Sequence, residues 1–269
     1  MQQAIVTLLS DFGLKDPYVA EMKAVILSKC SEAKIVDISH EIDKFNIRMG
    51  AFILGSATPY FPKGAVHVAV VDPGVGTKRR PIIVGTKHSH FVGPDNGLLM
   101  LAALKEGLRH VYTVENRKYM LSKVSRTFHG RDIFAIVAAY LARGVEVSEF
   151  GQKIKDYVVP DFAKPRLKED VVFGEVLHID DFGNVITNIS SEIIKKLAVR
   201  ENEFVKIEMG GKAAALKLCS AYGDVSLSSA LAIVGGHDFL EVSVNQGSAA
   251  KRFKVKSGDS IRVRRQGYC

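Results

Sequence analysis

The sequence predicts an α/β domain with a largely parallel sheet in the N-terminal part, followed by an all-β, barrel-like domain. In residues 1–155, apolar β-branched runs alternate with stretches of helical period, which is typical of α/β domains. In residues 171–269, short strands follow one another with Gly, Asp and Asn between them, as in small barrels and sandwiches. Residues 156–170 carry two prolines and scattered charges without a period, so we predict a linker there.

The first domain opens on the continuous run AIVTLLS, which is typical of a strand buried on both faces. Residues 16–30 then have helical period, because Val19, Met22 and Ile26 share one face. Asp16 and Pro17 are expected to supply the N-cap and the first turn of this helix. We predict further strands at AKIVDIS, AVHVAVV, PIIVGTK and HFVGP, and further helices at NIRMGAFILGSATPYF, GLLMLAALKEG and GRDIFAIVAAYLARG.

The second domain is predicted to be built of strands. They are VVFGEVLHI, NVITNI, FVKIEM, KAAALKL, LAIVGG, FLEVSV, RFKVKS and SIRVRR. The last two alternate in a way that predicts a strand pair with its basic residues on one face.

Composition and charge limit the partners of this chain. Its 269 residues are 47% hydrophobic and 25% charged, as in ordinary globular proteins. The net charge of +8 suggests nucleic acid as a partner. However, the basic C-terminal residues fit one face of a strand pair, Trp is absent, and no recognition-helix pattern occurs. We therefore expect no nucleic-acid partner.

The same sequence features predict a cytoplasmic protein. No apolar run approaches the roughly 18 uncharged residues that a membrane helix needs, so no membrane association is expected. The start, MQQAIVTLLSDFG, lacks a basic segment and predicts a first strand rather than a signal peptide. Cys30, Cys219 and Cys269 are odd in number and widely spaced, which indicates neither a disulfide framework nor a zinc site.

Polar side chains follow several predicted strands, where a parallel sheet presents its ligand-binding edge. These stretches are LLSDFGLKD with Asp11 and Asp16, VVDPGVGTKRR with Asp72, Arg79 and Arg80, FVGPDNGLL with Asp95 and Asn96, and TFHGRD with Phe128, His129, Arg131 and Asp132. A further stretch, HIDDFGNVITNI, opens the second domain with Asp180, Asp181, Phe182 and Asn184.

Several of these residues have structural alternatives. The sequence PDNG has the composition of a turn, so Asp95 and Asn96 could serve the turn alone. Asp132 could cap the following helix with Arg131 as its ion partner, and His129 could be a buried structural histidine. Taken one at a time, these motifs are weak indications of a site.

Known metal and cofactor signatures are missing. Residues of metal-ligating type occur, but without HExxH or Cys/His spacing; they are Asp37, His40, Asp72, His129, His178 and Asp180. The sequence also lacks GxGxxG, the P-loop and GxSxG. We expect neither a metal nor a cofactor.

Taken together, five motifs identify a family resemblance. TLLSDFG, VDPGVGTKRR, VGPDNGLL, TFHGRDIFA and DDFGNVITNI occur in this order along the chain. The chain thereby resembles the S-adenosyl-L-methionine hydroxide adenosyltransferase family, hydrolytic relatives of the fluorinase and chlorinase enzymes, from residue 7 to about residue 250. The resemblance implies an N-terminal α/β domain, a C-terminal β-barrel, and a homotrimer with active sites at subunit interfaces.

The resemblance also implies the reaction: S-adenosylmethionine (SAM) and water give adenosine and L-methionine. The hydrolytic triad of the family falls on Asp72, Arg79 and His129, which makes DPGVGTKRR the segment that holds the attacking water. The halogenating relatives carry tyrosines at the positions of Asp72 and His129, and this departure favours hydrolysis. Either Asp72 or His129 could take the proton from water.

Substrate-binding positions carry over from the resemblance as well. They are Asp11 for the ribose hydroxyls, Phe45 under the ribose, Phe128 in the triad motif, Asp16 and Asp180 near the methionine amino group, Asn184 and Asn245 for adenine, and Phe182 and Tyr222 as stacking faces. HIDDFGN is one residue shorter than in the halogenases, so Asp181 could replace Asp180. His237 stands where the halogenases have an arginine near the methionine end.

Two other functions remain open on the sequence. A protein that binds SAM or adenosine without useful turnover would need the same ribose and adenine residues, and only the triad distinguishes it. A basic nucleic-acid-binding β-barrel joined to an α/β domain is the alternative from another class, and salt-dependent binding would reveal it.

Overall fold

A computed structural model describes residues 4–266 and divides the chain into two compact units between Pro160 and Asp161. The strand β8 (Arg166–Lys168) lies inside the segment predicted as a linker and pairs with the strand that follows it. Within the described residues, no helix is long and apolar enough to cross a membrane.

Within residues 4–160, seven strands form one mixed sheet in the order β2-β1-β3-β5-β4-β6-β7. The first four of these strands in space run parallel to one another, whereas β4 pairs antiparallel with β5, and β6 and β7 continue the sheet antiparallel. The bounds are β1 Ile5–Ser10, β2 Lys34–Ser39, β3 Val66–Val70, β4 Pro81–Gly85, β5 His90–Pro94, β6 His110–Thr113 and β7 Lys153–Ile154.

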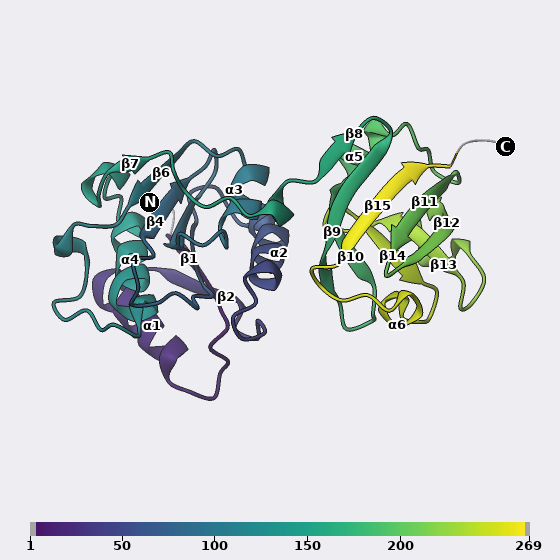
Figure 1. The fold of residues 1–269 in the computed structure, drawn as a ribbon. Coiled ribbons are helices and arrows are strands. Elements are labelled where there is room, and N and C mark those ends of the chain that lie inside the picture. Colours follow the sequence, from purple (N-terminus) through teal and green to yellow (C-terminus); the bar gives the residue numbers. More distant parts are fainter. Residues whose placement is uncertain (1–3, 267–269) are drawn as a thin grey trace. The chain divides into compact units, whose positions relative to one another are not determined.

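Helices cover both faces of this sheet (Figure 1). The helices α1 (Tyr18–Lys29) and α4 (Ile136–Ala142) pack together on one face, and α2 (Ile47–Ala57) and α3 (Met100–Lys105) pack together on the other. The apolar face predicted for α1 is buried as expected, with Met22 and Ile26 fully covered. The predicted N-cap is wrong, because Pro17 occupies that position and no side chain caps the helix.

The second unit is a closed barrel, as the sequence predicts. Within residues 161–266, the strands β10-β14-β13-β12-β11-β15-β9 pair in this order, and β10 pairs back onto β9. Closure leaves no unpaired barrel edge, and the inward-facing side chains form one apolar core. The bounds are β9 Val171–Ile179, β10 Val185–Ser190, β11 Phe204–Met209, β12 Lys212–Cys219, β13 Ala230–Val234, β14 Phe239–Val244 and β15 Ser260–Arg265, with the short helices α5 Ser191–Lys196 and α6 Ala249–Phe253.

One predicted strand of the barrel is wrong. The stretch RFKVKS forms the end of α6 and a loop, so it does not pair with β15. Ser248 caps α6 by accepting a hydrogen bond from the backbone N–H of Lys251, and Lys254 ends it in the left-handed conformation. Phe253 and Val255 still reach the barrel core, so a helix followed by a turn satisfies the same alternation of apolar residues.

Candidate active site

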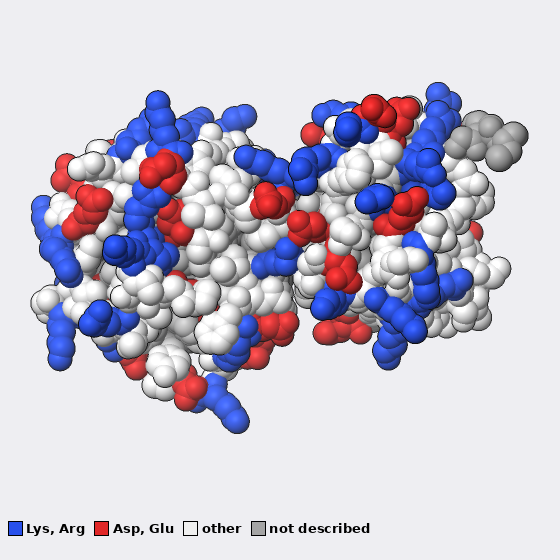
Figure 2. Space-filling model, viewed as in Figure 1, with Lys and Arg blue, Asp and Glu red and all other residues white. Residues whose placement is uncertain are grey.

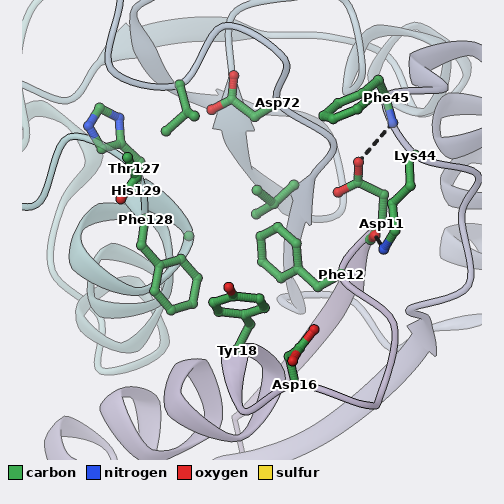
Figure 3. A pocket seen from close by; sticks show the side chains of 13 residues that line it. Asp11, Phe12, Asp16, Tyr18, Lys44, Phe45, Asp72, Thr127, Phe128 and His129 are labelled. Carbon is green, nitrogen blue, oxygen red and sulfur yellow. Dashed lines mark hydrogen bonds between the residues drawn. The ribbon is translucent and has the colours of Figure 1, made fainter.

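The carboxyl ends of β1 and β3 meet at one edge of the first unit's sheet, and a cavity of about 240 Å³ lies there. Asp11 directly follows β1, and Asp72 follows β3 (Figure 3). The parallel pairing of these two strands thus brings Asp11 and Asp72, far apart in the sequence, into one pocket. The lining includes the predicted residues Asp11, Asp16, Phe45, Asp72, Phe128 and His129, together with Phe12, Tyr18, Lys44, Val75 and Thr127.

The Asp11 carboxylate is held in a fixed position by the loop before α2. The backbone N–H of Phe45 donates to Oδ2 of Asp11 at 2.9 Å, and the Lys44 ammonium donates to the Asp11 carbonyl (Figure 3). Phe45 has a φ of 65°, which is unusual for a residue other than glycine. This strained backbone directs the Phe45 N–H at Asp11, while the phenyl ring stays 67% exposed beside the cavity.

An aromatic wall forms one side of the same cavity (Figure 3). The ring centroids of Phe12, Tyr18 and Phe128 lie 5.2–5.7 Å from one another in tilted and edge-on contacts. Arg131 lies over the ring of Phe128, with its guanidinium carbon 4.9 Å from the centroid. Arg131 also pairs with Asp132 at 2.7 Å, which is the ion pair that the sequence offered as a structural alternative. The wall offers an apolar surface to a bound molecule.

Asp72, Arg79 and His129 are joined by hydrogen bonds. Nε of Arg79 donates to Oδ1 of Asp72 at 3.1 Å, and Nη2 donates to Oδ2 of the same carboxylate. Nη2 also lies 3.1 Å from Nδ1 of His129. The side chains of Arg79 and Asp72 are almost wholly buried, and Nη1 of Arg79 has no partner. Arg79 does not itself line the cavity, so it acts by holding Asp72 and His129, which do.

A glycine allows the two loops that carry these residues to approach closely. Gly76 has a φ of +76°, and a Cβ atom there would lie 2.2 Å from the carbonyl oxygen of Arg126. The loop 71–80 therefore packs directly against the loop that leads to His129, which begins the π-helix η3 (Gly130–Ala135). This contact explains the glycine that follows Val75 in the sequence DPGVGTKRR.

The protonation of His129 follows from its neighbours. Burial, and next the charge of Arg79, hold the pKa of the imidazole below its ordinary value, while Asp72 and Asp132 act in the opposite direction. Because a guanidinium only donates hydrogen bonds, the Nδ1 that faces Arg79 is an acceptor. His129 is thus neutral near pH 7 and carries its proton on Nε2.

The second arginine of the pair has a structural partner. Arg80 donates to the buried carboxylate of Asp95 at 2.7 and 3.1 Å and to Asp156 at 3.0 Å. The other oxygen of Asp95 accepts the backbone N–H of Val158 at 2.9 Å. Asn96 binds the carbonyl of Val71, so the sequence PDNG fixes loops around the cavity without lining it.

The remaining predicted residues surround a second cavity, of about 550 Å³, in the barrel unit. Asp180 accepts hydrogen bonds from the backbone and the side-chain amide of Asn184 at 2.8 and 2.9 Å, which closes the turn between β9 and β10. Phe182 projects from this turn and is 82% exposed. The lining comprises Asp180, Phe182, Asn184, Tyr222 and Asn245 with Val244, Gln246 and Gly247.

A buried carboxyl group that the sequence did not indicate stands behind Tyr222. Glu241 is 5% exposed, and the Tyr222 hydroxyl donates to it at 3.4 Å. Burial raises the pKa of Glu241, and burial followed by the charge of Glu241 raises the pKa of Tyr222. Asp181 and His237, the alternative residues near the methionine end, do not line this cavity.

The predicted substrate-binding residues, with Asp72 and His129, thus fall on two cavities, each confined to one unit, and Arg79 contacts Asp72 and His129 without lining either cavity. Sequence reasoning missed Phe12, Tyr18 and Lys44, although each is within two residues of a predicted one.

Among residues 4–266, no group of three or more His, Cys, Asp or Glu side chains could hold a metal ion. Figure 2 shows Lys and Arg side chains spread over both units on the face drawn, with Asp and Glu between them.

A triad-like arrangement elsewhere is closed to substrates. Oγ of Ser10 lies 2.7 Å from Nδ1 of His40, whose Nε2 lies 3.2 Å from Asp37. Ser10 is fully buried, so these residues tie the ends of β1 and β2 together and cannot attack a bound molecule.

Comparisons with known proteins agree with this architecture. Residues 6–151 match the family model of the SAM hydroxide adenosyltransferase N-terminal domain, and residues 174–262 match that of the C-terminal domain. The chain is 37% identical to a Thermus thermophilus protein and 36% identical to a Methanocaldococcus jannaschii protein, both named (R)-S-adenosyl-L-methionine hydrolase. These matches cover 95% and 96% of this chain and 97% and 95% of the relatives. A crystal structure of an uncharacterized conserved protein from Thermotoga maritima is similar with a TM-score of 0.88 and 40% identity, over 97% of this chain and 100% of that one.

Proposed function

This chain belongs to the S-adenosyl-L-methionine hydroxide adenosyltransferase family and is an enzyme that hydrolyses SAM, and we propose that water attacks the ribose 5′ carbon in line with the C–S bond. The products are then adenosine and L-methionine. The observation that carries the mechanism is the hydrogen-bonded set of Asp72, Arg79 and His129 at the cavity of the first unit.

Asp72 is the general base in this proposal. Nδ1 of His129 faces Arg79, and its proton sits on Nε2, so the neutral imidazole has no lone pair left to accept a proton from water. The Asp72 carboxylate still has acceptor capacity beyond its bonds to Arg79. His129 accepts from Arg79 at Nδ1 and directs its other ring nitrogen at the backbone of Ser125, so His129 and Arg79 together hold the Asp72 carboxylate in place. A positioned base contributes on the order of 10²- to 10⁴-fold in rate.

The first unit binds the ribose and the sulfonium in this scheme. The ribose diol donates to the Asp11 carboxylate, which Phe45 and Lys44 already hold in place. Phe45 packs under the sugar, and the wall of Phe12, Tyr18 and Phe128 excludes water from the reacting carbon. As the C–S bond breaks, the positive charge on sulfur is neutralised, so a dry pocket favours the transition state. Asp16 lies at the edge of this wall, where the methionine amino group would be (Figure 3).

The barrel unit holds the adenine. Phe182 and Tyr222 supply stacking faces, Asn184 and Asn245 supply amide groups, and Asp180 offers its carboxylate to the methionine ammonium. The first cavity, at about 240 Å³, is smaller than a typical ligand site of about 300–1,000 Å³, which supports a site assembled from two surfaces. We place the second surface on a neighbouring subunit of a homotrimer.

Two measurements test the reaction and the assembly. In heavy-oxygen water, label should enter the 5′-hydroxyl of adenosine, whereas free adenine with labelled ribose, or unlabelled adenosine, contradicts in-line attack at the 5′ carbon. Light scattering after size-exclusion chromatography should give three times the mass of the chain. A monomer with full activity contradicts the shared site.

The names of the relatives suggest the sulfonium epimer as well. Both hydrolases act, by name, on (R)-SAM, so we extend this preference to the present chain. Incubation with separated epimers should consume the (R) form first, and equal rates for both would contradict the extension.

Activity should survive a chelator, because no metal is part of this mechanism. We also assign the protein to the cytoplasm, which its free Cys30 and Cys219 support.

A further inference from the structure

A third cavity, of about 680 Å³, lies in the first unit at the edge of the sheet opposite to Asp72. His67 at the amino end of β3 and Ser89 just before β5 contribute to its wall, as does the C-terminal end of α3. The cavity shares no lining residue with the cavity that holds Asp72, and the proposed hydrolysis gives it no role.

The wall of this cavity is a connected structure. The turn between β4 and β5 is closed by Thr86 and Ser89, whose hydroxyls both donate to Oε2 of Glu106. The backbone N–H of Gly64 donates to the carbonyl of His88 at 2.7 Å, which ties the loop before β3 to the same turn. The shape therefore depends on tertiary hydrogen bonds rather than on a single loose loop.

Cations outnumber the acid around the cavity. Lys63, Lys87 and Lys105 all line it and are exposed, while Glu106 is the carboxylate among its described lining residues. The stem of Lys87 packs on Gly107, where a Cβ atom would lie 2.8 Å from Cε of Lys87. Three ammonium groups against one carboxylate leave a net positive charge on the lining.

Two buried polar atoms in the wall have no partner. His67 is 1% exposed and Thr58 is 2% exposed, yet Nε2 of His67 and Oγ1 of Thr58 make no hydrogen bond. Nδ1 of His67 lies 2.8 Å from the hydroxyl of Thr7, which can donate to it and leave the ring proton on Nε2. Orphaned buried polar groups are rare and costly. Both atoms are enclosed by the wall, so a bound molecule would satisfy them once neighbouring side chains shift.

We propose that this cavity binds a small organic phosphate ester. The phosphate oxygens would accept from the lysine ammonium groups and from the unpartnered wall donors, Nε2–H of His67 and the Thr58 hydroxyl. The apolar part of the ester would pack on Phe61 and Leu104. The pKa of His67 is lowered to about 4 by burial, so this ring is neutral at physiological pH and donates without adding a second charge.

The test uses phenyl phosphate, with inorganic phosphate and benzoate as partial probes, in calorimetric titrations of the full chain. Phenyl phosphate should bind at least about ten-fold more tightly than inorganic phosphate, and its affinity should fall as salt is added. In amide NMR spectra, the signals of Gly64, His88 and Gly107 should shift. Shifts confined to the cavity around Asp72, or benzoate binding as tightly as phenyl phosphate, would overturn the proposal.

Matched variants locate the site. Replacing Lys63 and Lys87 together by Gln should weaken phenyl phosphate binding at least about ten-fold, whereas Lys123→Gln, on an exposed loop of the same unit, should leave it within two-fold. His67→Phe keeps an aromatic ring in the core and should weaken binding about five-fold through the lost donor. SAM hydrolysis should be unchanged in the lysine variants. Unchanged affinity in the double lysine variant would place phenyl phosphate elsewhere on the protein and overturn the proposal.

Discussion

Replacing Gly76 by Ala should separate the two loops that hold Asp72, Arg79 and His129. The new Cβ atom would lie 2.2 Å from the carbonyl oxygen of Arg126, and this carbonyl is backbone, so it cannot rotate away. The loops must then move apart by roughly 1 Å, a displacement that can lower kcat about 100-fold when it misplaces a reacting group. The positive φ of 76° adds about 1–2 kcal/mol of backbone strain.

Gly144→Ala is the matched control for this variant. Gly144 has a φ of +86°, and nothing lies within 4 Å of the position that a Cβ atom would take, so alanine there brings the strain without the collision. Steady-state rates of adenosine formation and urea unfolding of both variants separate the two effects. Both variants should lose about 1–2 kcal/mol of stability from the strain, and Gly76→Ala alone should lose kcat. A kcat within two-fold of the parent in Gly76→Ala, or an equal loss in Gly144→Ala, would refute the reasoning.

Three further predictions concern charge and protonation. Asp72→Asn should lower kcat by about 10²- to 10⁴-fold with little change in KM. Asp11→Asn should mainly raise KM, because ribose contacts exist in ground and transition states alike. A near-normal kcat in Asp72→Asn would contradict the role of Asp72 as the base. The pKa of the His129 imidazole, measured by NMR titration, should lie below its ordinary value of 6.5. Activity that needs the neutral ring should therefore persist until the pH falls below 6.5. A midpoint above 6.5 would contradict the contact with Arg79. His67 should destabilise the fold in acid, because the unfolded chain takes up a proton near pH 6.5 and the folded chain only near 4. The free energy of unfolding should therefore fall by about 3 kcal/mol as the pH drops through this window. In His67→Phe, the loss measured by urea unfolding should be smaller by that amount.

The fold class could be predicted because local patterns report it directly. The run AIVTLLS became β1 with five consecutive buried residues, and the apolar spacing around Met22 became the buried face of α1. The stretch RFKVKS could not be predicted in the same way, because alternating apolar residues fit a strand as well as a short capped helix with a following turn. Burial of Phe253 and Val255 in the barrel core, together with the Ser248 cap, decided between these two.

The candidate site was only partly visible along the chain. The motif VDPGVGTKRR identified Asp72 and Arg79 through its resemblance, but nothing in it assigns Arg79 and Arg80 to different partners. In the structure, Arg79 forms hydrogen bonds with Asp72 and His129, whereas Arg80 forms them with Asp95 and Asp156. Tyr18 and Lys44 line the cavity because the segments that carry them fold over the edge of the sheet.

The sequence by itself determined the two-domain α/β and barrel architecture, the family, and the residue types available for chemistry, because periodicity and motif order are properties of the chain. Tertiary structure decided which of those residues touch and in what protonation state. Parallel pairing of β1 and β3 brought Asp11 and Asp72 to the same cavity, and a glycine without a Cβ allowed two loops to pack closely before His129. Hydrogen-bond direction and burial depend on such contacts between distant segments. For that reason the neutral state of His129 follows from the fold and not from its place in TFHGRD.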